Sequence, residues 1–454
     1  MDIANTKQLT IFSSVTSNIL VGNEYNQVLY SLRGSAGTGK TWLVAQLIKE
    51  LKSKKISIQM CTPTHKALKV VRDMLKSIGL SNSDVEVSTI HSFLNLKLDY
   101  GLDDLNNIEA KPKLVANTSS YNENMRSVDL LILDESSMVN DELFQLILNV
   151  VGDRVKYVLF VGDAFQLKPV EGGENSLFDN PMITHYELTD TVRQKENSII
   201  IHKSNEIRDY IITKNYPKTI NDLFITEGEI EVITITEEFL VKYNENADDR
   251  TKMVGAYTNT VVDQYNAYLR YLKTYTKVTD PEDMPYLIVG EEIVLQSPYT
   301  NSNNDIVFQN GEEIKLKTAK LMEDPITGLM YWRCKSDGKF MEQRMLNILD
   351  PQSYDDFKEK LEIKLNLAKA ETDLLKKRDC WKDYFKFMNK YADVKYNFAS
   401  TIHKLQGSTY TDMFFDIRGL DRFYKYDPDN ILRLVYVAVT RASDNLYILK
   451  DVSF

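Results

Sequence analysis

The first half of the chain alternates short strand-like apolar runs with stretches in which apolar side chains recur every three or four positions. The strand-like runs cover residues 28–32, 56–60, 130–133 and 155–161, and the helical stretches cover residues 42–48, 66–78 and 142–151. This alternation is typical of a parallel β-sheet with helices on both faces. The pattern therefore predicts an α/β fold.

The alternation is interrupted once and then resumes. Residues 95–125 are polar, rich in Asn and too long for an ordinary connection, so we interpret them as an insertion. Beyond residue 190 the pattern predicts helices at 198–210 and 261–272 and a strand at 253–257. These elements indicate a second α/β unit.

Two regions with different sequence patterns follow. Residues 284–349 contain short strand-like runs and an Asn310-Gly311 pair, which favours a hairpin turn, and we predict a small β-barrel here. Residues 355–395 are rich in Lys and Glu and predict charged helices. Scaffolding is the simplest role for most of these residues.

Length and composition limit the domain count, the surface charge, the cysteine chemistry and the cellular compartment that we expect. A chain of 454 residues exceeds the ~250–300 residues at which single cores stop growing, so more than one domain is expected. The net charge of −10 argues against a uniformly basic surface but allows a local basic groove. The three cysteines are far apart and indicate neither a zinc site nor a disulfide framework. Without a signal-like or membrane-spanning run, we expect a cytoplasmic protein with no membrane contact.

Residues 34–41, Gly-Ser-Ala-Gly-Thr-Gly-Lys-Thr, match a phosphate-binding loop at every fixed position. The alternative is an ordinary glycine-rich turn, but a strand before the loop and a helix after it satisfy the context that the motif requires. Lys40 can reach the outer phosphates of a nucleotide, and the Thr41 hydroxyl can bind Mg²⁺. The sequence predicts a nucleotide site.

Acidic and amide side chains follow two other predicted strands. Residues 130–133 lead into Asp134 and Glu135, which suit a metal ligand and a group that orients or deprotonates water. A strand that ends in acidic residues by chance is the alternative. Gln166 lies in the loop that follows the strand 155–161 and could sense a γ-phosphate. The alternative is that Gly162-Asp163, which begin this loop, simply form a turn, as Gly-Asp after a strand often does.

Taken in order, these segments resemble the motifs of superfamily 1 helicases. The matching segments are residues 34–41, 61–67, 88–93, 134–137, 162–169, 188–193, 256–259, 400–407 and 435–442, which resemble motifs I, Ia, the next DNA-contacting motif, II, III, IV, IVa, V and VI. With Gln8 as a candidate adenine reader, the resemblance extends over nearly the whole chain. The Thr-Ile-His segments at 89–91 and 401–403 are most similar to those of the helicases that move 5′→3′, subgroup 1B.

The resemblance implies an α/β fold with two RecA-like parallel-sheet motor domains. A hairpin insertion would interrupt the first domain, and an SH3-like β-barrel with helices would interrupt the second. The implied boundaries are 1–94 with 126–187 for the first motor domain, 95–125 for the hairpin, 188–283 with 396–454 for the second motor domain, and 284–395 for the barrel and helices.

The resemblance also implies that ATP and Mg²⁺ are bound between the motor domains. The implied catalytic residues are Lys40, Glu135, Gln166, Arg193 and Arg441, and Mg²⁺ would be held by Thr41 and Asp134. The implied nucleotide-binding residues are Gln8, Gly34, Ala36, Gly37, Thr38, Gly39, Lys40, Thr41, Gln406 and Gly407. Without the resemblance, Arg193 and Arg441 would be read as surface salt-bridge residues. Val192 departs from the aromatic residue that many relatives place beside the arginine.

A single strand of DNA would cross both domains, held by phosphate contacts and base stacking. The candidate contacts are Thr64, His65, Thr89, His91, Phe93, Tyr257, Thr258, Asn259, Thr401, His403 and Lys404. Phe93 and Tyr257 could stack on bases or belong to the core. Within 95–125, candidate wedge residues for splitting duplex are Leu96, Leu98 and Tyr100.

These features together predict an ATP-dependent 5′→3′ DNA helicase acting in replication, recombination or repair. Single-stranded DNA and junctions with duplex are its expected partners, a single-strand-binding or replication protein is a candidate partner, and a monomer is expected. One alternative is a translocase that strips bound proteins and unwinds poorly. Another is an ATP-gated nucleic-acid clamp or loading factor, and RNA remains an alternative substrate.

Overall fold

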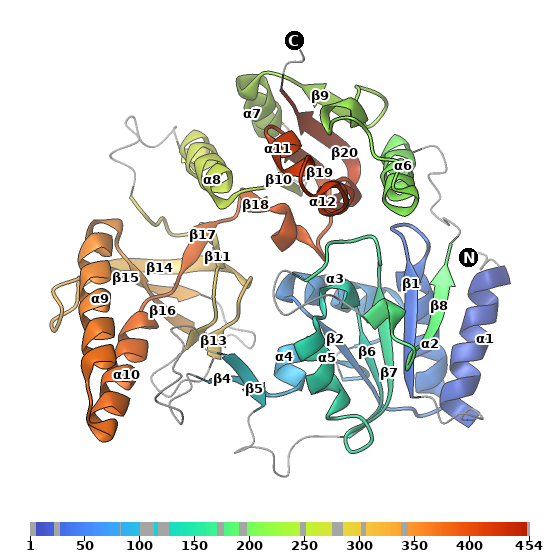
Figure 1. Cartoon of the computed structure of the whole chain (residues 1–454), viewed down its shortest axis with the longest axis horizontal. Helices are drawn as coiled ribbons and strands as arrows, with labels where there is room; N and C mark the ends of the chain where they lie inside the picture. Colours follow the sequence, from blue (N-terminus) through green and yellow to red (C-terminus); the bar gives the residue numbers. More distant parts are fainter. Residues whose placement is uncertain are drawn as a thin grey trace. The chain divides into compact units, whose positions relative to one another are not determined.

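The computed structural model describes residues 6–21, 28–81, 83–99, 113–116, 127–169, 177–189, 198–245, 251–274, 285–300, 306–336 and 344–451. These residues form two compact units (Figure 1). The first unit comprises residues 1–95, 118–262 and 399–454, and the second comprises residues 96–117 and 263–398. Among the described residues, no helix is long and apolar enough to cross a membrane.

The first unit begins with a six-stranded sheet in the order β3-β2-β6-β7-β1-β8. Its strands are β1 (Leu29–Gly34), β2 (Ile58–Thr62), β3 (Glu86–Thr89), β6 (Val128–Leu133), β7 (Val155–Gly162) and β8 (Thr184–Leu188). Every neighbouring pair is parallel, so the predicted parallel sheet is confirmed. The apolar-run analysis did not anticipate β3 and β8, because both are short and only partly buried.

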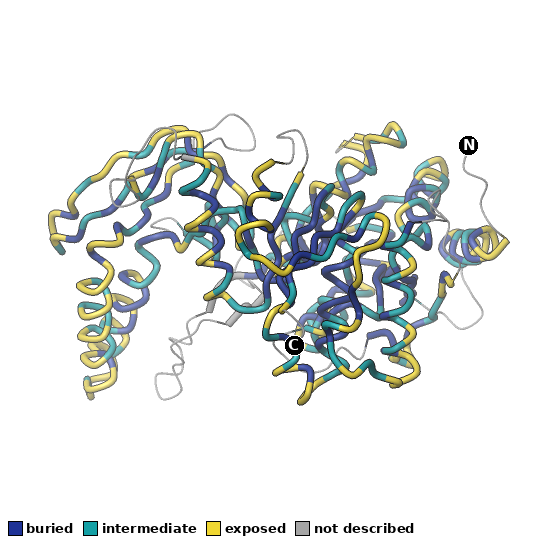
Figure 2. The backbone as a smooth tube through the Cα atoms, turned by 90° about the horizontal axis from the view of Figure 1, so that it is seen from above, coloured by how far each residue is buried: buried dark blue, intermediate teal, exposed yellow. Residues whose placement is uncertain are grey.

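Helices cover this sheet and follow its strands in the chain. They are α1 (Thr6–Val21), α2 (Lys40–Ser53), α3 (His65–Ser77), α4 (Ile90–Phe93) and α5 (Asp141–Leu148), with short 3₁₀ helices η2 (Ser136–Met138) and η3 (Leu177–Asp179). Thr64 and Asn140 cap α3 and α5 by accepting backbone N–H groups, which fixes where these helices begin. The buried faces of α1, α2 and α3 pack with the strands into one hydrophobic core. Figure 2 shows buried residues in dark blue and exposed residues in yellow along the backbone.

The second sheet of the first unit has the order β18-β10-β19-β20-β9, again with parallel neighbours. Its strands are β9 (Ile230–Ile233), β10 (Lys252–Ala256), β18 (Ala399–Thr401), β19 (Tyr410–Asp416) and β20 (Ala442–Leu449). Its helices are α6 (Ile199–Thr213), η4 (Asn221–Leu223), α7 (Thr236–Glu245), α8 (Asn259–Thr274, which runs on into the second unit), η7 (Ile402–Leu405), α11 (Leu420–Tyr424) and α12 (Pro428–Arg441). The predicted second α/β unit is confirmed as a second parallel sheet.

Helix α12 is deeply buried and contributes to the site described below. It begins at Pro428, where the missing N–H costs nothing, and Asp427 caps it by accepting the N–H of Asn430. Nearly every residue from Ile431 to Val439 is buried against α6 and the sheet. Any polar side chain on this segment must therefore find a partner inside the protein.

The second unit contains a five-stranded antiparallel sheet in the order β16-β15-β14-β11-β17. Its strands are β11 (Glu292–Leu295), β14 (Glu313–Glu323), β15 (Met330–Ser336), β16 (Arg344–Leu349) and β17 (Val394–Tyr396), with the pairs β12 (Tyr299–Thr300) with β13 (Ile306–Phe308) and β4 (Leu96–Asp99) with β5 (Lys113–Ala116). Its helices are η6 (Pro351–Ser353), α9 (Tyr354–Ala370) and α10 (Leu374–Met388).

The short strands and charged helices predicted for this region are present. A turn also forms at Asn310-Gly311, but the strands that it joins, β13 and β14, belong to different sheets, so the predicted hairpin is not formed there. Gly311 has a φ of 72°, as the turn at Asn310-Gly311 requires. The aromatic residues Trp381, Tyr384 and Phe385 of α10 are buried against α9. Closure of the antiparallel sheet into an SH3-like barrel stays a prediction.

Candidate nucleotide and nucleic-acid site

The loops that carry the predicted motifs leave the first sheet at one edge, where its parallel strands end. In the strand register, Cys61 lies opposite Leu133, Leu133 opposite Phe160, and Arg33 opposite Gly162. The strands β2, β6, β7 and β1 therefore end side by side, and we call this the carboxyl edge. In open parallel sheets this edge is where ligands bind.

The phosphate-binding loop connects β1 to α2 at this edge. Gly37 and Gly39 have φ angles of 82° and 84°, a backbone conformation that residues with a side chain rarely adopt. A Cβ on Gly34 would lie 2.6 Å from the Thr38 Oγ1 atom, so only glycine fits there. The Lys40 ammonium donates to the carbonyl oxygens of Gly34 (2.6 Å) and Ser35 (3.0 Å), which holds the cation inside the loop.

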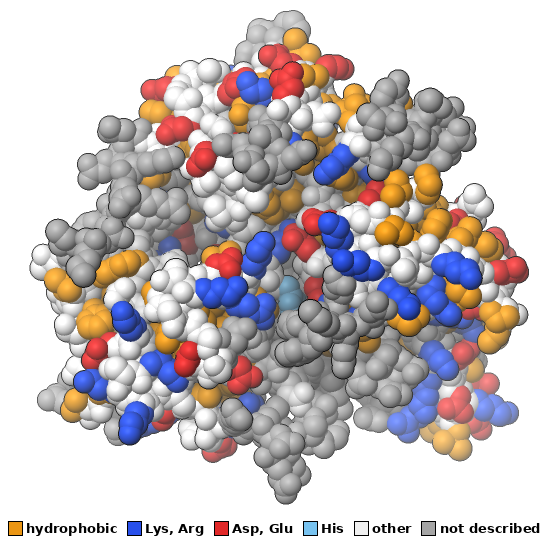
Figure 3. Space-filling view, turned by 180° about the vertical axis from the view of Figure 1, so that it is seen from behind, with side chains coloured by type: hydrophobic (Ala, Val, Ile, Leu, Met, Phe, Trp, Pro, Cys, Tyr) orange, Lys and Arg blue, Asp and Glu red, His pale blue; other side chains and the backbone are white. Residues whose placement is uncertain are grey.

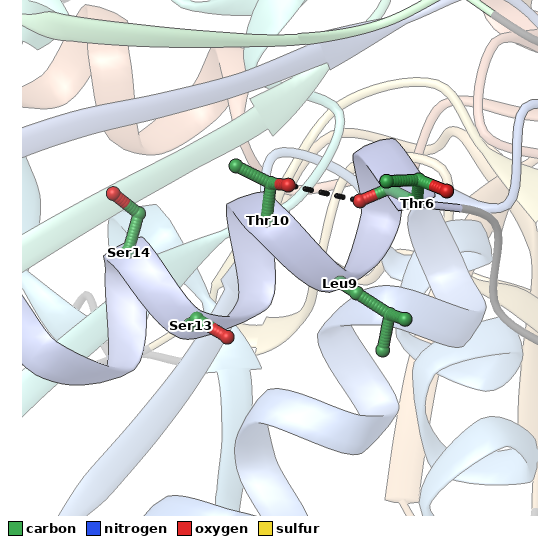
Figure 4. A pocket seen from close by; sticks show the side chains of 5 residues that line it. All are labelled: Thr6, Leu9, Thr10, Ser13 and Ser14. Atoms are coloured by element: carbon green, nitrogen blue, oxygen red, sulfur yellow. Dashed lines mark hydrogen bonds between the residues drawn. The ribbon is translucent and has the colours of Figure 1, made fainter.

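Gln8, the predicted adenine reader, belongs to α1 and is almost completely buried. Its Nε2 atom donates to the carbonyl oxygen of Thr38 at 3.3 Å, so the side chain contacts the phosphate-binding loop. A separate shallow hollow on α1 is lined by Thr6, Leu9, Thr10, Ser13 and Ser14 (Figure 4). There the Thr10 hydroxyl donates to its own helix at the Thr6 carbonyl, and Gln8 is not part of this hollow.

The two predicted metal ligands lie close together. Thr41 and Asp134 line one small cavity whose other lining residues are apolar, namely Val44, Met60, Val70, Val71, Met74 and Val161. Burial, followed by the neighbouring Glu135 charge, raises the pKa of Asp134 to about 7, although the Glu135 N–H and the Lys40 cation act in the opposite direction. A hydroxyl and a carboxylate are oxygen ligands of the kind that Mg²⁺ takes, and a bound cation would favour the ionised carboxylate.

Glu135 has a φ of 53°, an uncommon backbone conformation for a residue with a side chain. Backbone strain of this kind clusters at functional sites and persists only where the surrounding structure enforces it. Here the Glu135 N–H donates to the Asp134 Oδ1 atom at 2.9 Å. This hydrogen bond holds the Asp134 carboxylate against the strained backbone of Glu135.

Gln166 lies in the loop after β7, 7 % exposed. Within the described part of the chain, its Oε1 atom has no hydrogen-bond partner. A buried acceptor without a partner costs free energy, which suits a group whose ligand is a nucleotide or its bound water. The backbone of the same loop is held from the second sheet, because the Arg433 guanidinium donates to the carbonyl oxygens of Ala164 (2.6 Å) and Gln166 (3.3 Å).

Two side chains from the second sheet reach the phosphate-binding loop itself, and sequence reasoning assigned neither. The Tyr436 hydroxyl accepts the Ala36 N–H at 3.1 Å, and Arg208 donates to the Ser35 Oγ atom at 3.1 Å. Tyr436 lies inside the segment that resembles motif VI, so its position was known but not its role. Nothing in the local sequence around Arg208 distinguishes it from other arginines on a helix surface.

The predicted second-sheet residues Arg441 and Gln406 are buried near this edge. In this structure the Arg441 guanidinium donates to the carbonyl oxygens of Ser408 (2.8 Å) and Val437 (3.2 Å) and does not contact the phosphate-binding loop. Gln406 donates to the carbonyl oxygen of Leu167 at 3.4 Å, across from the second sheet to the first. Arg193 and Val192 lie outside the described residues.

Gly407 connects the nucleotide and nucleic-acid candidates. Its φ is 73°, and a Cβ placed on it would lie 3.1 Å from the Ala67 Cβ atom, 3.5 Å from the Glu135 Cγ atom and 3.6 Å from the Thr64 Oγ1 atom. The backbone after η7 therefore lies within van der Waals distance of both Glu135 and Thr64, whereas the positive φ and the closer approach to Ala67 are what favour glycine here. Movement of this segment would change its contacts with both Glu135 and Thr64.

The predicted nucleic-acid contacts on the first sheet follow neighbouring strands. Thr62 of β2 lies opposite Thr89 of β3, which brings the segments after the two strands to one edge. Thr89 caps α4 by accepting the Ser92 N–H. Burial lowers the pKa of His91, so its imidazole is neutral near pH 7.

Phe93 is 8 % exposed, and the Arg154 guanidinium lies over its ring at 4.9 Å. Of the two roles considered for this ring, base stacking or core packing, the burial favours core packing. The wedge candidate Tyr100 and the side chain of Leu98 lie outside the described residues, whereas Leu96 is buried.

The contacts predicted on the second sheet also converge on one edge. Ala256 of β10 lies opposite Thr401 of β18, so the segments after these strands are neighbours. Tyr257 is half-buried, with its ring centroid 4.6 Å from that of Phe423 and 6.2 Å from that of His403. The other candidates here are Thr258, Asn259 and Lys404; Asn259 and Lys404 are exposed. On the face drawn in Figure 3, Lys and Arg side chains are interspersed with Asp and Glu, so that face is not uniformly basic.

Comparison with known proteins supplies independent information. A family described as AAA domain matches residues 21–226, and a family described as UvrD-like helicase C-terminal domain matches residues 396–449. The chain is 27 % identical over 455 residues to the ATP-dependent DNA helicase dda of Enterobacteria phage T4, covering 92 % of this chain and 93 % of that protein. It is 28 % identical over 236 residues to the ATP-dependent DNA helicase Pif1 of Campylobacter jejuni, covering 49 % of this chain and 47 % of that protein.

A solved structure shares the fold. The Pif1 helicase from Bacteroides, in complex with ADP-AlF3 and ssDNA, superimposes with a TM-score of 0.50 at 17 % identity, covering 100 % of this chain and 93 % of that one. At this identity the likeness establishes the mixed α/β fold with its RecA-like parallel-sheet core and nothing about chemistry.

Proposed function

We propose that this chain, an ATP-hydrolysing DNA helicase of superfamily 1, subgroup 1B, moves 5′→3′ along single-stranded DNA and unwinds the duplex ahead of it. One observation carries the proposal. The carboxyl edge that bears the phosphate-binding loop, Asp134 and Gln166 is contacted by Arg433 and Tyr436 from the second sheet. Hydrolysis at such an edge can be coupled to movement of one sheet against the other.

The first sheet would supply the groups that bind and activate the nucleotide. Lys40 would pair with the outer phosphates, and Thr41 and Asp134 would hold Mg²⁺, whose charge would stabilise the negative charge that develops on the transferred phosphoryl group. Glu135 would orient the attacking water and accept its proton. Gln166 would donate from its Nε2 atom to the γ-phosphate, or accept a hydrogen bond from that water at its Oε1 atom, which has no partner among the described residues.

The second sheet would complete the site with cations. Arg441 would leave its carbonyl partners Ser408 and Val437 and reach the transferred phosphoryl group when the sheets close, and Arg193 would act with it. An arginine supplied in this way contributes about 10³–10⁵ in rate in well-studied phosphate-loop enzymes. Because the arginines reach the phosphate only on closure, hydrolysis would be coupled to an opening and closing cycle.

The strand would cross the ends of both sheets. Thr64, His65, Thr89 and His91 would contact it from the first sheet, and the remaining candidates named above would contact it from the second. Gly407, which approaches both Glu135 and Thr64, supports a direct connection between strand binding and hydrolysis. The proposed ligands are single-stranded DNA and its junctions with duplex.

Separation of duplex would use the segment 95–125. Its strands β4 and β5 pair in the antiparallel sense, with Leu96 opposite Ala116, which supports the proposed hairpin. Residues 96–117 belong to the same compact unit as the antiparallel sheet and helices of residues 263–398, which supports a bracing role for that region. The proposed motor domains are 1–94 with 126–187 and 188–283 with 396–454.

The deciding experiment measures unwinding of a short DNA duplex that carries either a 5′ or a 3′ single-stranded tail, with ATP hydrolysis followed in the same samples. Separation only from the 5′ tail is expected. Separation only from the 3′ tail would reverse the proposed polarity. DNA-stimulated hydrolysis without separation from either tail would favour the protein-stripping translocase or the clamp.

A further inference from the structure

Helix α12 presents two polar side chains, one turn apart, to the carboxyl edge of the first sheet. Arg433 and Tyr436 are three residues apart and therefore lie on one face of the helix. Arg433 donates to two backbone carbonyl oxygens of the loop after β7 and also pairs with the Asp429 carboxylate of its own helix at 2.9 Å. Tyr436 makes a different set of contacts, and these extend to a second loop.

The Tyr436 hydroxyl joins three parts of the protein. It accepts the Ala36 N–H of the phosphate-binding loop at 3.1 Å and donates to the Asp163 Oδ2 atom at 2.7 Å. Asp163 is 1 % exposed, and its other carboxylate oxygen accepts the Phe165 N–H at 2.9 Å. Burial and the nearby Asp163 charge raise the pKa of Tyr436 well above its ordinary value, so the hydroxyl keeps its proton and stays a donor.

Packing alone does not require a hydroxyl here. Phenylalanine would fill the same volume, and Tyr436 is 1 % exposed, so its oxygen gains nothing from solvent. A buried hydroxyl is favourable only where its hydrogen bonds replace those lost with water. Removing it would leave the Ala36 N–H and a buried carboxylate oxygen without this partner.

We infer that Tyr436 is a positioning residue: its hydroxyl fixes the phosphate-binding loop, the Gln166 loop and α12 relative to one another, and so sets where Arg441 acts. Arg441 is the last residue of the same helix, five positions beyond Tyr436. Displacement of α12 from the two loops would therefore move the arginine away from the transferred phosphoryl group. This inference rests on the ATP hydrolysis given under Proposed function.

The chain offers a matched control for removal of one hydroxyl. Tyr424 of α11 is 5 % exposed, and its hydroxyl donates to the carbonyl oxygen of Pro217 at 2.7 Å, within the second sheet's own surroundings. Tyr424→Phe therefore removes a buried tyrosine hydrogen bond without affecting either loop. A purely structural role for Tyr436 would make the two substitutions equivalent.

The experiment compares Tyr436→Phe with Tyr424→Phe in the full chain. It measures kcat and KM for DNA-stimulated ATP hydrolysis, the Kd of a fluorescent non-hydrolysable ATP analogue, and thermal unfolding. For Tyr436→Phe, kcat should fall at least about tenfold while the Kd stays within about threefold, because the substitution removes both hydrogen bonds of the hydroxyl and a buried hydrogen bond is worth up to about a factor of ten. For Tyr424→Phe, kcat and Kd should be unchanged.

Three outcomes would overturn the inference: an unchanged kcat in Tyr436→Phe, an equal loss of kcat in both variants, or a loss of nucleotide affinity that accounts for the whole effect. A second variant keeps the test decisive if Tyr436→Phe folds poorly. Asp163→Ala should also lower kcat, and the double variant should lose less than the two single losses combined, since both variants remove the Tyr436–Asp163 hydrogen bond. Additive losses would contradict the bridge.

Failure of the inference is distinguishable from failure of the proposed function. A wild-type chain that shows no DNA-stimulated ATP hydrolysis would refute the proposed function. An active wild-type chain with an unimpaired Tyr436→Phe variant would refute only the role of the hydroxyl.

Discussion

The two parallel sheets of the first unit contribute to the candidate site in different ways. On the first sheet, the important groups directly follow strand ends, as Asp134 follows β6 and the phosphate-binding loop follows β1. On the second sheet, long side chains from α6 and α12 extend to loops of the first sheet. The first contribution is local in sequence, whereas the second depends on how the two sheets meet.

This difference implies that substitutions on the two sides should have different kinetic effects. Removing a first-sheet group should remove a step of the chemistry. Removing a second-sheet group should leave the nucleotide bound and impair the closed arrangement in which it reacts. Four substitutions or conditions test this contrast, taken in order of decreasing expected effect.

Lys40→Ala should abolish measurable ATP hydrolysis while DNA affinity stays within about threefold of wild type. The ammonium that now donates to Gly34 and Ser35 is the charge that would pair with the outer phosphates, and removing it also loosens the loop. ATPase assays and fluorescence anisotropy with labelled single-stranded DNA would measure the two quantities. Lys49→Ala, on the exposed face of the same helix, is the control. Loss of DNA binding in a folded Lys40→Ala variant would contradict the division between the sites.

Arg441→Ala should reduce kcat by about 10²–10³ while the nucleotide Kd changes only modestly, because an arginine supplied from the second sheet acts on the transition state. Arg422→Ala, an exposed arginine of the neighbouring α11, should have no effect. Stopped ATPase time courses and binding of a non-hydrolysable analogue would separate kcat from affinity. An unchanged kcat would mean that the contacts of Arg441 with Ser408 and Val437 are its whole role.

Sequence reasoning succeeded where a residue's role depends on its immediate neighbours. The chain is similar to known DNA helicases, as the resemblance implied. The first parallel sheet was predicted from the alternation of apolar patterns, which also indicated a second α/β unit, and a parallel sheet for that unit was implied by the resemblance. A phosphate-binding loop is recognisable because its strand, glycines and helix are contiguous. The predicted metal ligands Thr41 and Asp134 line the same cavity for the same reason, since each follows a strand whose position in the sheet is constrained.

The contacts that sequence reasoning missed are those between segments hundreds of residues apart. Tyr436 meets Ala36 across 400 positions, and Arg208 meets Ser35 across 173 positions. No periodicity or spacing encodes such a pair, because the contact arises only when two independently folded sheets pack together. The burial of Phe93 is similar, because the side chain that covers it, Arg154, comes from the loop before β7.

Arg208→Gln should lower kcat/KM for ATP by about fivefold, less than any change at Lys40 or Arg441. Its single hydrogen bond to the Ser35 hydroxyl is worth about 1 kcal/mol, and the guanidinium is partly exposed to solvent. Asp209→Asn keeps the guanidinium and removes only its exposed carboxylate neighbour at 3.6 Å, so this variant should match wild type. A loss as large as that of Arg441→Ala would place Arg208 on the phosphates and break the contrast between the two sheets.

The smallest expected effect is a change of pH acting on the histidines of the proposed DNA path. Burial lowers the pKa of both His91 and His403, so each imidazole is neutral above about pH 6.5, the ordinary value for histidine. A charged histidine on a phosphate would lose affinity as the pH rises through its pKa. Neutral histidines predict DNA affinity that changes less than about twofold between about pH 6.5 and about pH 8.5 at constant ionic strength.

His403 stands beside Tyr257, with 6.2 Å between the ring centroids, so its expected contribution is packing or a hydrogen bond and not charge. Anisotropy titrations of wild type and His403→Gln at both pH values would measure this. Gln keeps hydrogen-bonding capacity and has no titration, so the two proteins should show parallel pH profiles. A profile that falls with rising pH in wild type but not in His403→Gln would show that His403 is protonated when DNA is bound.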